Sequence, residues 1–122
     1  MPNALATANA VRHDLKTLDG GFIVIKRLTY GQKLERQGMI KVQFSNQNSG
    51  KKDFKGELEM ANRIATYYEF THCIVEHNLT GANDVPLDLT NPAIIDQLDP
   101  RIGEEISTLI GDLNNFEDDE KN

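Results

Sequence analysis

A run of apolar, β-branched residues near the N-terminus predicts a strand. Residues 21–28 read GFIVIKRL, a stretch too short for a stable helix, and they overlap the end of a glycine-containing turn at residues 18–21. A single strand is not stable in water. The predicted strand therefore needs a partner strand, either from the same chain or from another copy.

The next apolar positions predict a short helix and then an ambiguous segment. Thr29 is a suitable N-cap for a helix over residues 29–37, and Gly38 offers a C-terminal exit. In residues 39–44 every second position is apolar, which favours a strand that pairs with residues 22–28. The alternative is that the helix continues through this segment.

The longest periodic segment predicts a central helix over residues 53–77. No proline or glycine interrupts it after Gly56, and Asn78 followed by Gly81 marks its end. The positions that recur at steps of three or four are Phe54, Leu58, Ala61, Ile64, Ala65, Tyr68, His72 and Val75.

The C-terminal third predicts two further helical segments after a connector at residues 79–90. Asn91 and Asp99 are each followed by proline, which is the usual start of a helix with an N-cap and a proline in the first turn. The second segment carries the clearest amphipathic stripe of the chain, and Asn114 and Asn115 end it. The stripe consists of Ile102, Ile106, Leu109, Ile110 and Leu113.

Together these elements predict a mainly α domain with a small N-terminal β element, an α+β fold in which the long central helix packs on the C-terminal helix pair. We expect a flexible arm at residues 1–17, a single domain at residues 18–114 and an acidic disordered tail at residues 115–122. The length of 122 residues suits one such domain.

Composition and charge argue against several classes of partner. No run of about 20 apolar residues could span a membrane, and the N-terminus lacks a signal-peptide pattern, so we expect a cytoplasmic protein without a membrane partner. Residues 1–78 carry 11 basic and 8 acidic residues, whereas residues 79–122 carry 2 and 11. The acidic part disfavours nucleic acid, and the asymmetry favours protein contacts that include self-association. The simpler interpretation is that two solvated faces differ in charge.

One cluster of residues resembles a chemical site, but a structural role explains it more simply. His72, Cys73, Glu76 and His77 lie within six residues, and Cys73 and His77 would share a face of the central helix. A closed zinc site needs about four ligands, and a Cys–His nucleophile needs an orienting group and an oxyanion hole. We therefore expect no catalytic residue, no cofactor and no metal, with a small metal-dependent protein as the lesser alternative.

The C-terminal stripe is the better candidate for a binding surface. A small helical core leaves part of such a stripe exposed, and exposed apolar surface favours partners. The simpler interpretation is that the stripe belongs to the core. The candidate partner-binding residues are Ile102, Ile106, Leu109, Ile110, Leu113 and Phe116.

The order of segments is more telling than any single site. RHDLKTL (residues 12–18) precedes the glycine turn and strand, LTYGQKLERQ (28–37) follows, the long helix ends in EFTHCIVEHNLT (69–80), and LDPRIGEEI (98–106) and NNFE (114–117) complete the series. Over most of residues 12–117, this arrangement resembles the small tail assembly chaperones of long-tailed bacteriophages that infect Gram-positive bacteria.

The resemblance implies binding without catalysis. Members of that family are made late in infection, coat the long, helical, apolar tape measure protein until tail tube subunits replace it, and are absent from the finished virion. Many also exist in a longer form that ribosomal frameshifting produces. We accordingly expect a chaperone that solubilises the tape measure protein in the cytoplasm of the infected host, by a helix-in-groove contact. The alternative is a structural head–tail connector or tail completion protein, which would stay in the virion.

Overall fold

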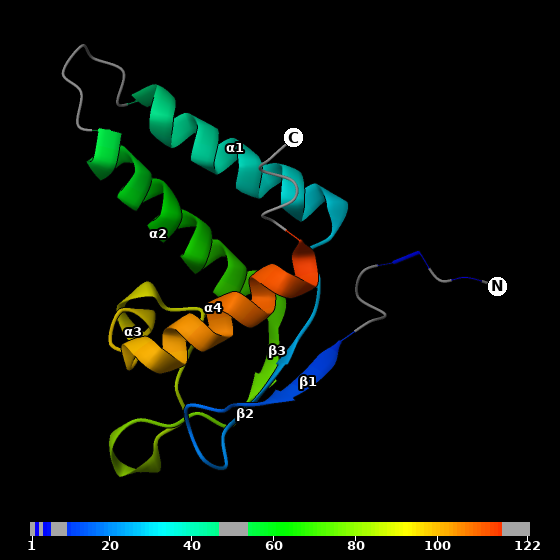
Figure 1. Ribbon diagram of the computed structural model, residues 1–122, viewed down its shortest axis with the longest axis vertical. Coiled ribbons are helices and arrows are strands. Elements are labelled where there is room, and N and C mark those ends of the chain that lie inside the picture. Colours follow the sequence, from blue (N-terminus) through cyan, green and yellow to red (C-terminus); the bar gives the residue numbers. More distant parts are fainter. Residues whose placement is uncertain (1, 3, 6–9, 47–53, 116–122) are drawn as a thin grey trace.

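The computed structural model describes residues 2, 4–5, 10–46 and 54–115, and within them the chain has a mixed α/β fold (Figure 1). Its elements are β1 (Val11–Asp14), β2 (Phe22–Ile25), α1 (Tyr30–Asn46), α2 (Phe54–Cys73), β3 (Ile74–His77), the 3-10 turn η2 (Ala82–Asp84), α3 (Pro92–Ile95) and α4 (Pro100–Asn114). The predicted combination of helices with a small β element near the N-terminus is confirmed.

The sheet is antiparallel, with β2 between β1 and β3. Ile23 and Ile25 of β2 are fully buried, whereas Phe22 and Val24 are partly exposed. Successive side chains of a strand point to opposite faces, so Ile23 and Ile25 together present one apolar face to the core. The predicted strand is thus confirmed over β2, and both of its partner strands come from this chain.

The first partner strand lies inside the predicted N-terminal arm. Within residues 1–17 the structure forms β1, which pairs along its whole length with β2. The guanidinium of Arg12 also lies over the ring of Phe22, 4.2 Å from its centroid. The sequence of β1 contains one apolar residue, Val11, so pairing with β2 and not local propensity accounts for the strand.

The second partner strand corrects the C-terminal limit of the predicted central helix. Residues 53–77 were expected to be helical, but α2 ends at Cys73 and the next four residues form β3. Ile74 and Val75 are β-branched, which favours a strand, and Ile74 pairs with the buried Ile25. β2 therefore gains a second hydrogen-bonded neighbour at the expense of one helical turn.

The strand predicted at residues 39–44 is wrong, because α1 continues through Gly38 and this segment, as in the alternative interpretation. A strand would place Ile40 and Val42 on the same face. In α1, Ile40 is half-buried, whereas the side chain of Val42 is 56% exposed. The helix instead places Ile40 one turn after Arg36, which is buried against α2.

The predicted helix starts are confirmed by their hydrogen bonds. The Thr29 hydroxyl accepts from the N–H of Gln32 at 3.1 Å, and the Gln32 side chain accepts from the N–H of Thr29 at 3.0 Å, which makes a reciprocal capping box. The side chains of Asn91 and Asp99 cap α3 and α4. Asn115, in the left-handed conformation, follows the last residue of α4.

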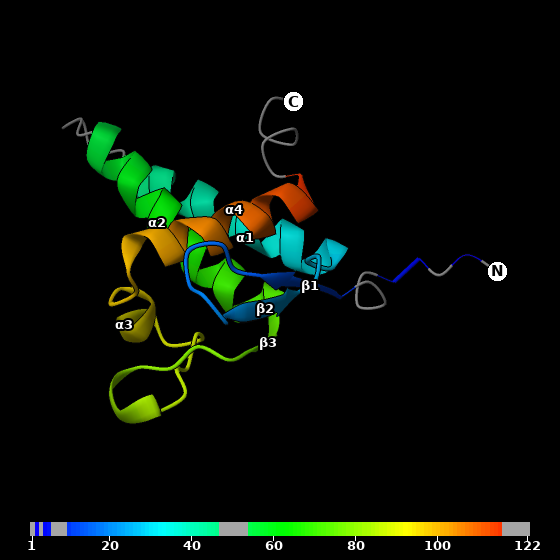
Figure 2. The same ribbon diagram turned by 60° about the horizontal axis from the view of Figure 1, so that its bottom comes forward.

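The helices form one pair and one crossing (Figures 1 and 2). α1 and α2 run side by side in opposite directions, and α4 packs across the end of α2 that lies near the sheet. The main helical neighbour of α2 is therefore α1, whereas the sequence pattern pointed to the C-terminal helices. The short α3 is tied to α2 by the Tyr67 hydroxyl, which donates to Asp96 at 2.6 Å.

The core lies where the sheet, α2 and α4 meet. Its largest fully buried side chains come from all three of these parts of the fold. They are Ile23, Ile25, Phe70, Cys73, Ile106 and Ile110.

Candidate functional site

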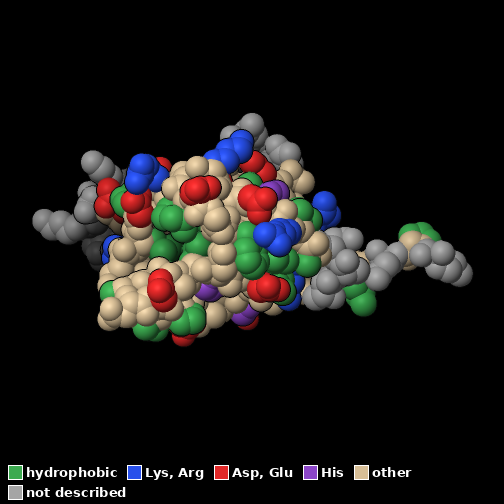
Figure 3. All heavy atoms as spheres, turned by 90° about the horizontal axis from the view of Figure 1, so that it is seen from below, with side chains coloured by type: hydrophobic (Ala, Val, Ile, Leu, Met, Phe, Trp, Pro, Cys, Tyr) green, Lys and Arg blue, Asp and Glu red, His purple; other side chains and the backbone are tan. Residues whose placement is uncertain are grey.

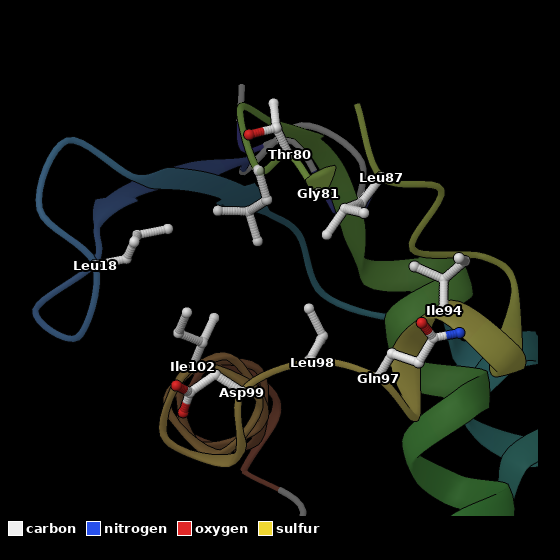
Figure 4. A pocket seen from close by; sticks show the side chains of 10 residues that line it. Leu18, Thr80, Gly81, Leu87, Ile94, Gln97, Leu98, Asp99 and Ile102 are labelled. Atoms are coloured by element: carbon white, nitrogen blue, oxygen red, sulfur yellow. The ribbon is translucent and has the colours of Figure 1, made fainter. Parts of the chain in front are cut away.

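An apolar groove beside the sheet is the candidate functional site (Figure 4). It has a volume of about 290 Å³, and four parts of the chain meet there: the β1–β2 turn, the connector after β3, α3 and the start of α4. Its lining residues, which define the groove, are Leu18, Leu79, Thr80, Gly81, Leu87, Ile94, Gln97, Leu98, Asp99 and Ile102.

The lining side chains divide into a buried floor and an exposed wall. Leu79 is 3% exposed and forms the floor, whereas Leu18 at the rim is 38% exposed. Figure 4 shows Leu18, Leu98 and Ile102 directed toward the same space as Leu87 on the opposite side. A concave apolar surface with few polar groups is the usual form of a binding site.

The surface view agrees with this description. In Figure 3, which looks from the side of the β1–β2 turn, hydrophobic side chains line a hollow in the molecular surface, and charged side chains lie around it. An occupant would therefore find apolar contacts inside the hollow and charged groups at its edge.

His77 holds two lining segments of the groove together. Its Nδ1 accepts a hydrogen bond from the N–H of Leu79 at 3.0 Å, and the ring also hydrogen-bonds to the backbone of Leu87. An Nδ1 that accepts requires the neutral ring with its proton on Nε2. Burial lowers the pKa of His77 below its ordinary value of 6.5, although the bond to Leu87 and the nearby Asp88 carboxylate raise it.

This arrangement predicts that the protein loses stability as the pH falls below about 6.5. The unfolded chain takes up a proton on His77 at a higher pH than the folded chain does, so acid favours the unfolded state. In urea unfolding at pH 7.5, 6.5 and 5.5, His77→Gln should show a smaller acid-induced loss than the wild type. His13→Gln is the matched control, because Ile23 of β2 pairs with His13 of β1 on one side and with His77 of β3 on the other. Equal pH dependence in the wild type and His77→Gln would contradict the prediction.

Glu105 of α4 fixes the turn that carries Leu18. Its carboxylate accepts from the N–H of Lys16 at 2.8 Å, from the N–H of Thr17 at 3.0 Å and from the Thr17 hydroxyl at 2.6 Å. Burial raises the pKa of Glu105, but these hydrogen bonds together lower it by more. The pKa of Glu105 therefore lies below its ordinary value of 4.5. The charged carboxylate therefore holds the β1–β2 turn against α4.

Four of the candidate partner-binding residues on α4 are part of the core. Ile106 and Ile110 are fully buried. Leu109 and Leu113 are partly buried and pack against the core cluster. Most of the amphipathic stripe therefore stabilises the domain, as in the simpler interpretation of the pattern.

The other two candidate residues differ from those four. Ile102, in the first turn of α4, is partly buried and packs against the core cluster as Leu109 and Leu113 do, but it also lines the groove. Phe116 lies outside the described residues. Ile102 is therefore the residue through which the predicted stripe reaches the groove.

The His72–His77 cluster does not form the common helix face that its spacing suggested. Cys73 ends α2 and His77 ends β3, so the two residues belong to different elements. Burial raises the pKa of the Cys73 thiol to about 12, which keeps it protonated and unsuited to nucleophilic attack at neutral pH. The ring of His72 packs against Tyr68, with 4.2 Å between centroids. Over residues 10–46 and 54–115, no group of three or more His, Cys, Asp and Glu could hold a metal ion.

Sequence reasoning missed the leucines that form the walls of the groove. Leu18, Leu87 and Leu98 lie in turns and connectors, where no periodicity joins them. One signal could have identified them: each is a large apolar residue within a stretch of turn-forming residues, and each is followed directly by aspartate.

Comparison of the chain with protein-family models, with curated proteins and with solved structures found no match. Among the helices that the structure describes, none combines the length and apolar character needed to cross a membrane.

Proposed function

We propose that this protein is a tail assembly chaperone of a long-tailed bacteriophage, which binds and solubilises the tape measure protein in the cytoplasm of the infected host. The observation that carries the proposal is the groove, an apolar hollow that opens on the surface of the molecule. Such a site suits the apolar face of a helical partner. The resemblance in the order of segments indicates which helical partner this is.

The chemistry of the groove supports binding in preference to catalysis. Its polar lining residues are Thr80, Gln97 and Asp99. The Asp99 carboxylate is engaged in capping α4 and in an ion pair with Arg101 at 3.1 Å. The Gln97 amide donates to the Ala93 carbonyl at 3.0 Å. These groups do not form the nucleophile and base that acyl or phosphoryl transfer would require.

Exposed apolar side chains also lie on α1 and α2. Tyr30 is 75% exposed, and Leu34, Val42, Leu58 and Met60 are each more than 40% exposed. A partner is indicated only where such side chains form a contiguous patch, so the proposal is argued from the groove alone.

Co-expression tests the proposal. The tape measure protein is produced in bacteria alone or together with this protein, and its soluble fraction is measured. We expect several-fold more soluble tape measure protein in the presence of the wild type, and loss of most of that gain with Leu18→Gln, because a polar amide replaces an apolar contact at the rim of the groove.

The matched control for this experiment is Val75→Gln. Val75 is 53% exposed on β3 and does not line the groove, so its substitution should leave the gain unchanged. No increase in soluble tape measure protein with the wild type would contradict the proposal. Mass spectrometry of purified virions provides a separate check, since stoichiometric amounts of the protein in the particle would favour a structural connector or tail completion protein.

A further inference from the structure

We propose that the groove takes an amphipathic helix that inserts two large apolar side chains, four residues apart, and that carries Lys or Arg beside them. The inference rests on the proposed function, because it defines the chemistry of the partner segment at that same site. Three observations carry it: the volume of the groove, the aspartates that directly follow lining leucines, and the single Lys or Arg among the described residues next to the lining in the chain.

The volume of the groove indicates the number of inserted side chains. A cavity of about 150 Å³ in a protein core holds one benzene molecule. The groove, at about 290 Å³, has room for roughly twice that amount of apolar material. Two residues four positions apart lie on the same face of a helix, about 5–6 Å from each other. One helix can therefore place both side chains in the groove together.

A repeated dipeptide puts aspartates next to lining leucines in the chain. Leucine is followed by aspartate three times in the sequence, and in each case the leucine lines the groove. The three aspartates are exposed. Each pair thus contributes an apolar side chain to the wall and a carboxylate next to it in the chain. The pairs are Leu18–Asp19, Leu87–Asp88 and Leu98–Asp99.

The residues next to the groove lining in the chain are acidic overall. Asp96 adds a fourth carboxylate next to the lining residue Gln97. Among the described residues that neighbour a lining residue in the chain, Arg101 is the single Lys or Arg, and it is paired with Asp99. Hydrogen bonds from Thr90 and from Arg101 lower the pKa of Asp88 and of Asp99, respectively, so both carboxylates are charged at neutral pH.

This charge pattern favours a cationic partner segment. Complementary charges at the rim of an interface accelerate association and exclude partners of the wrong sign, and salt screens them. The lining also contains no Lys, Arg or His that would bind a phosphate group, so a nucleotide suits the site poorly. A helix of this kind would place its apolar face against the lining of the groove and its Lys or Arg side chains near the neighbouring aspartates.

Fluorescence anisotropy with designed peptides tests the inference on the full-length protein. The first labelled 18-residue peptide is helical, with Leu and Phe four residues apart and Lys or Arg beside them. The second has Glu in place of Lys and Arg, and the third is the first with a central proline that prevents a continuous helix. We expect the first peptide to bind at least ten-fold more tightly than either of the others at 50 mM salt, with a smaller advantage over the second at 300 mM.

Two variants connect the result to the groove. Leu18→Gln should weaken binding of the first peptide about ten-fold, whereas Val75→Gln should not change it. The triple variant Asp19→Asn, Asp88→Asn, Asp96→Asn should reduce the preference for the first peptide over the second by about five-fold. Circular dichroism confirms that each variant is folded.

The outcomes separate this inference from the proposed function. Equal binding of all three peptides, or unchanged binding by Leu18→Gln, would overturn the inference even if co-expression solubilises the tape measure protein. Conversely, a preference for the first peptide without any solubilisation in co-expression would support the chemistry of the groove and contradict the proposed function.

Discussion

Replacing Glu69 with alanine is expected to lower the free energy of unfolding by about 3–5 kcal/mol, because it leaves the buried Arg36 guanidinium without this carboxylate. Nε of Arg36 lies 3.0 Å from a carboxylate oxygen of Glu69, and the two side chains are only 9% and 8% exposed. The pair joins α1 to α2, so its loss should also loosen the contact between these helices. Urea unfolding followed by circular dichroism measures the effect.

Two further variants make this experiment decisive. Replacing both partners, in Arg36→Met with Glu69→Leu, removes both charges and should recover much of the lost stability, since apolar side chains of similar volume can replace a buried ion pair. Arg101→Ala breaks the exposed pair with Asp99, in which the arginine side chain is 77% exposed, and should leave the free energy of unfolding nearly unchanged. If Glu69→Ala is no more harmful than Arg101→Ala, the buried pair is not important for stability.

This pair also illustrates which features of the fold are local and which are not. The starts of three helices were predictable because the decisive hydrogen bonds lie within a few residues of Thr29, Asn91 and Asp99. The partner of Arg36 is 33 residues away along the chain. The local pattern left both a strand and a continued helix open after Gly38, and nothing near Arg36 indicates that this helix packs against α2.

The same distinction explains the errors in the sheet. β2 was predictable because four consecutive apolar residues mark it, whereas β1 and β3 exist through their pairing with β2. β3 follows α2 without a turn residue between them, so the periodic pattern of the helix appeared to extend to His77. The β-branched Ile74 and Val75 and the pairing with β2 together made this segment a strand, although the helical spacing of apolar residues continues into it.

The groove was harder to predict than any single element. Its lining residues are spread along the chain from Leu18 to Ile102. The side chains of His77 and Glu105 make the polar contacts that help to hold these segments together. His77 joins Leu79 to Leu87, and Glu105 holds the β1–β2 turn that carries Leu18. A binding surface built from loops on a rigid scaffold is common in proteins, and here the scaffold is the sheet together with α4.

The amphipathic stripe of α4 leads to the second large prediction, which separates stability from binding within one helix. Ile106→Ala should lower the free energy of unfolding by about 2–5 kcal/mol, because Ile106 is completely buried and its truncation leaves a cavity in the core. Ile102→Ala should cost about 1 kcal/mol, because this side chain is only partly buried and lines the open groove.

Peptide binding should be affected more by Ile102→Ala than by Ile106→Ala, which is the reverse of their effects on stability. At a temperature where both variants are folded, Ile102→Ala should weaken binding of the basic helical peptide several-fold, since it removes part of the apolar wall, while Ile106→Ala should leave binding nearly unchanged. Urea unfolding and fluorescence anisotropy on the same protein samples give the two measurements. A loss of less than about 1 kcal/mol for Ile106→Ala would show that the stripe is not core. Weaker binding by Ile106→Ala than by Ile102→Ala would instead place the interface on the stripe and not at the groove, because Ile106 contributes nothing to the groove in this fold.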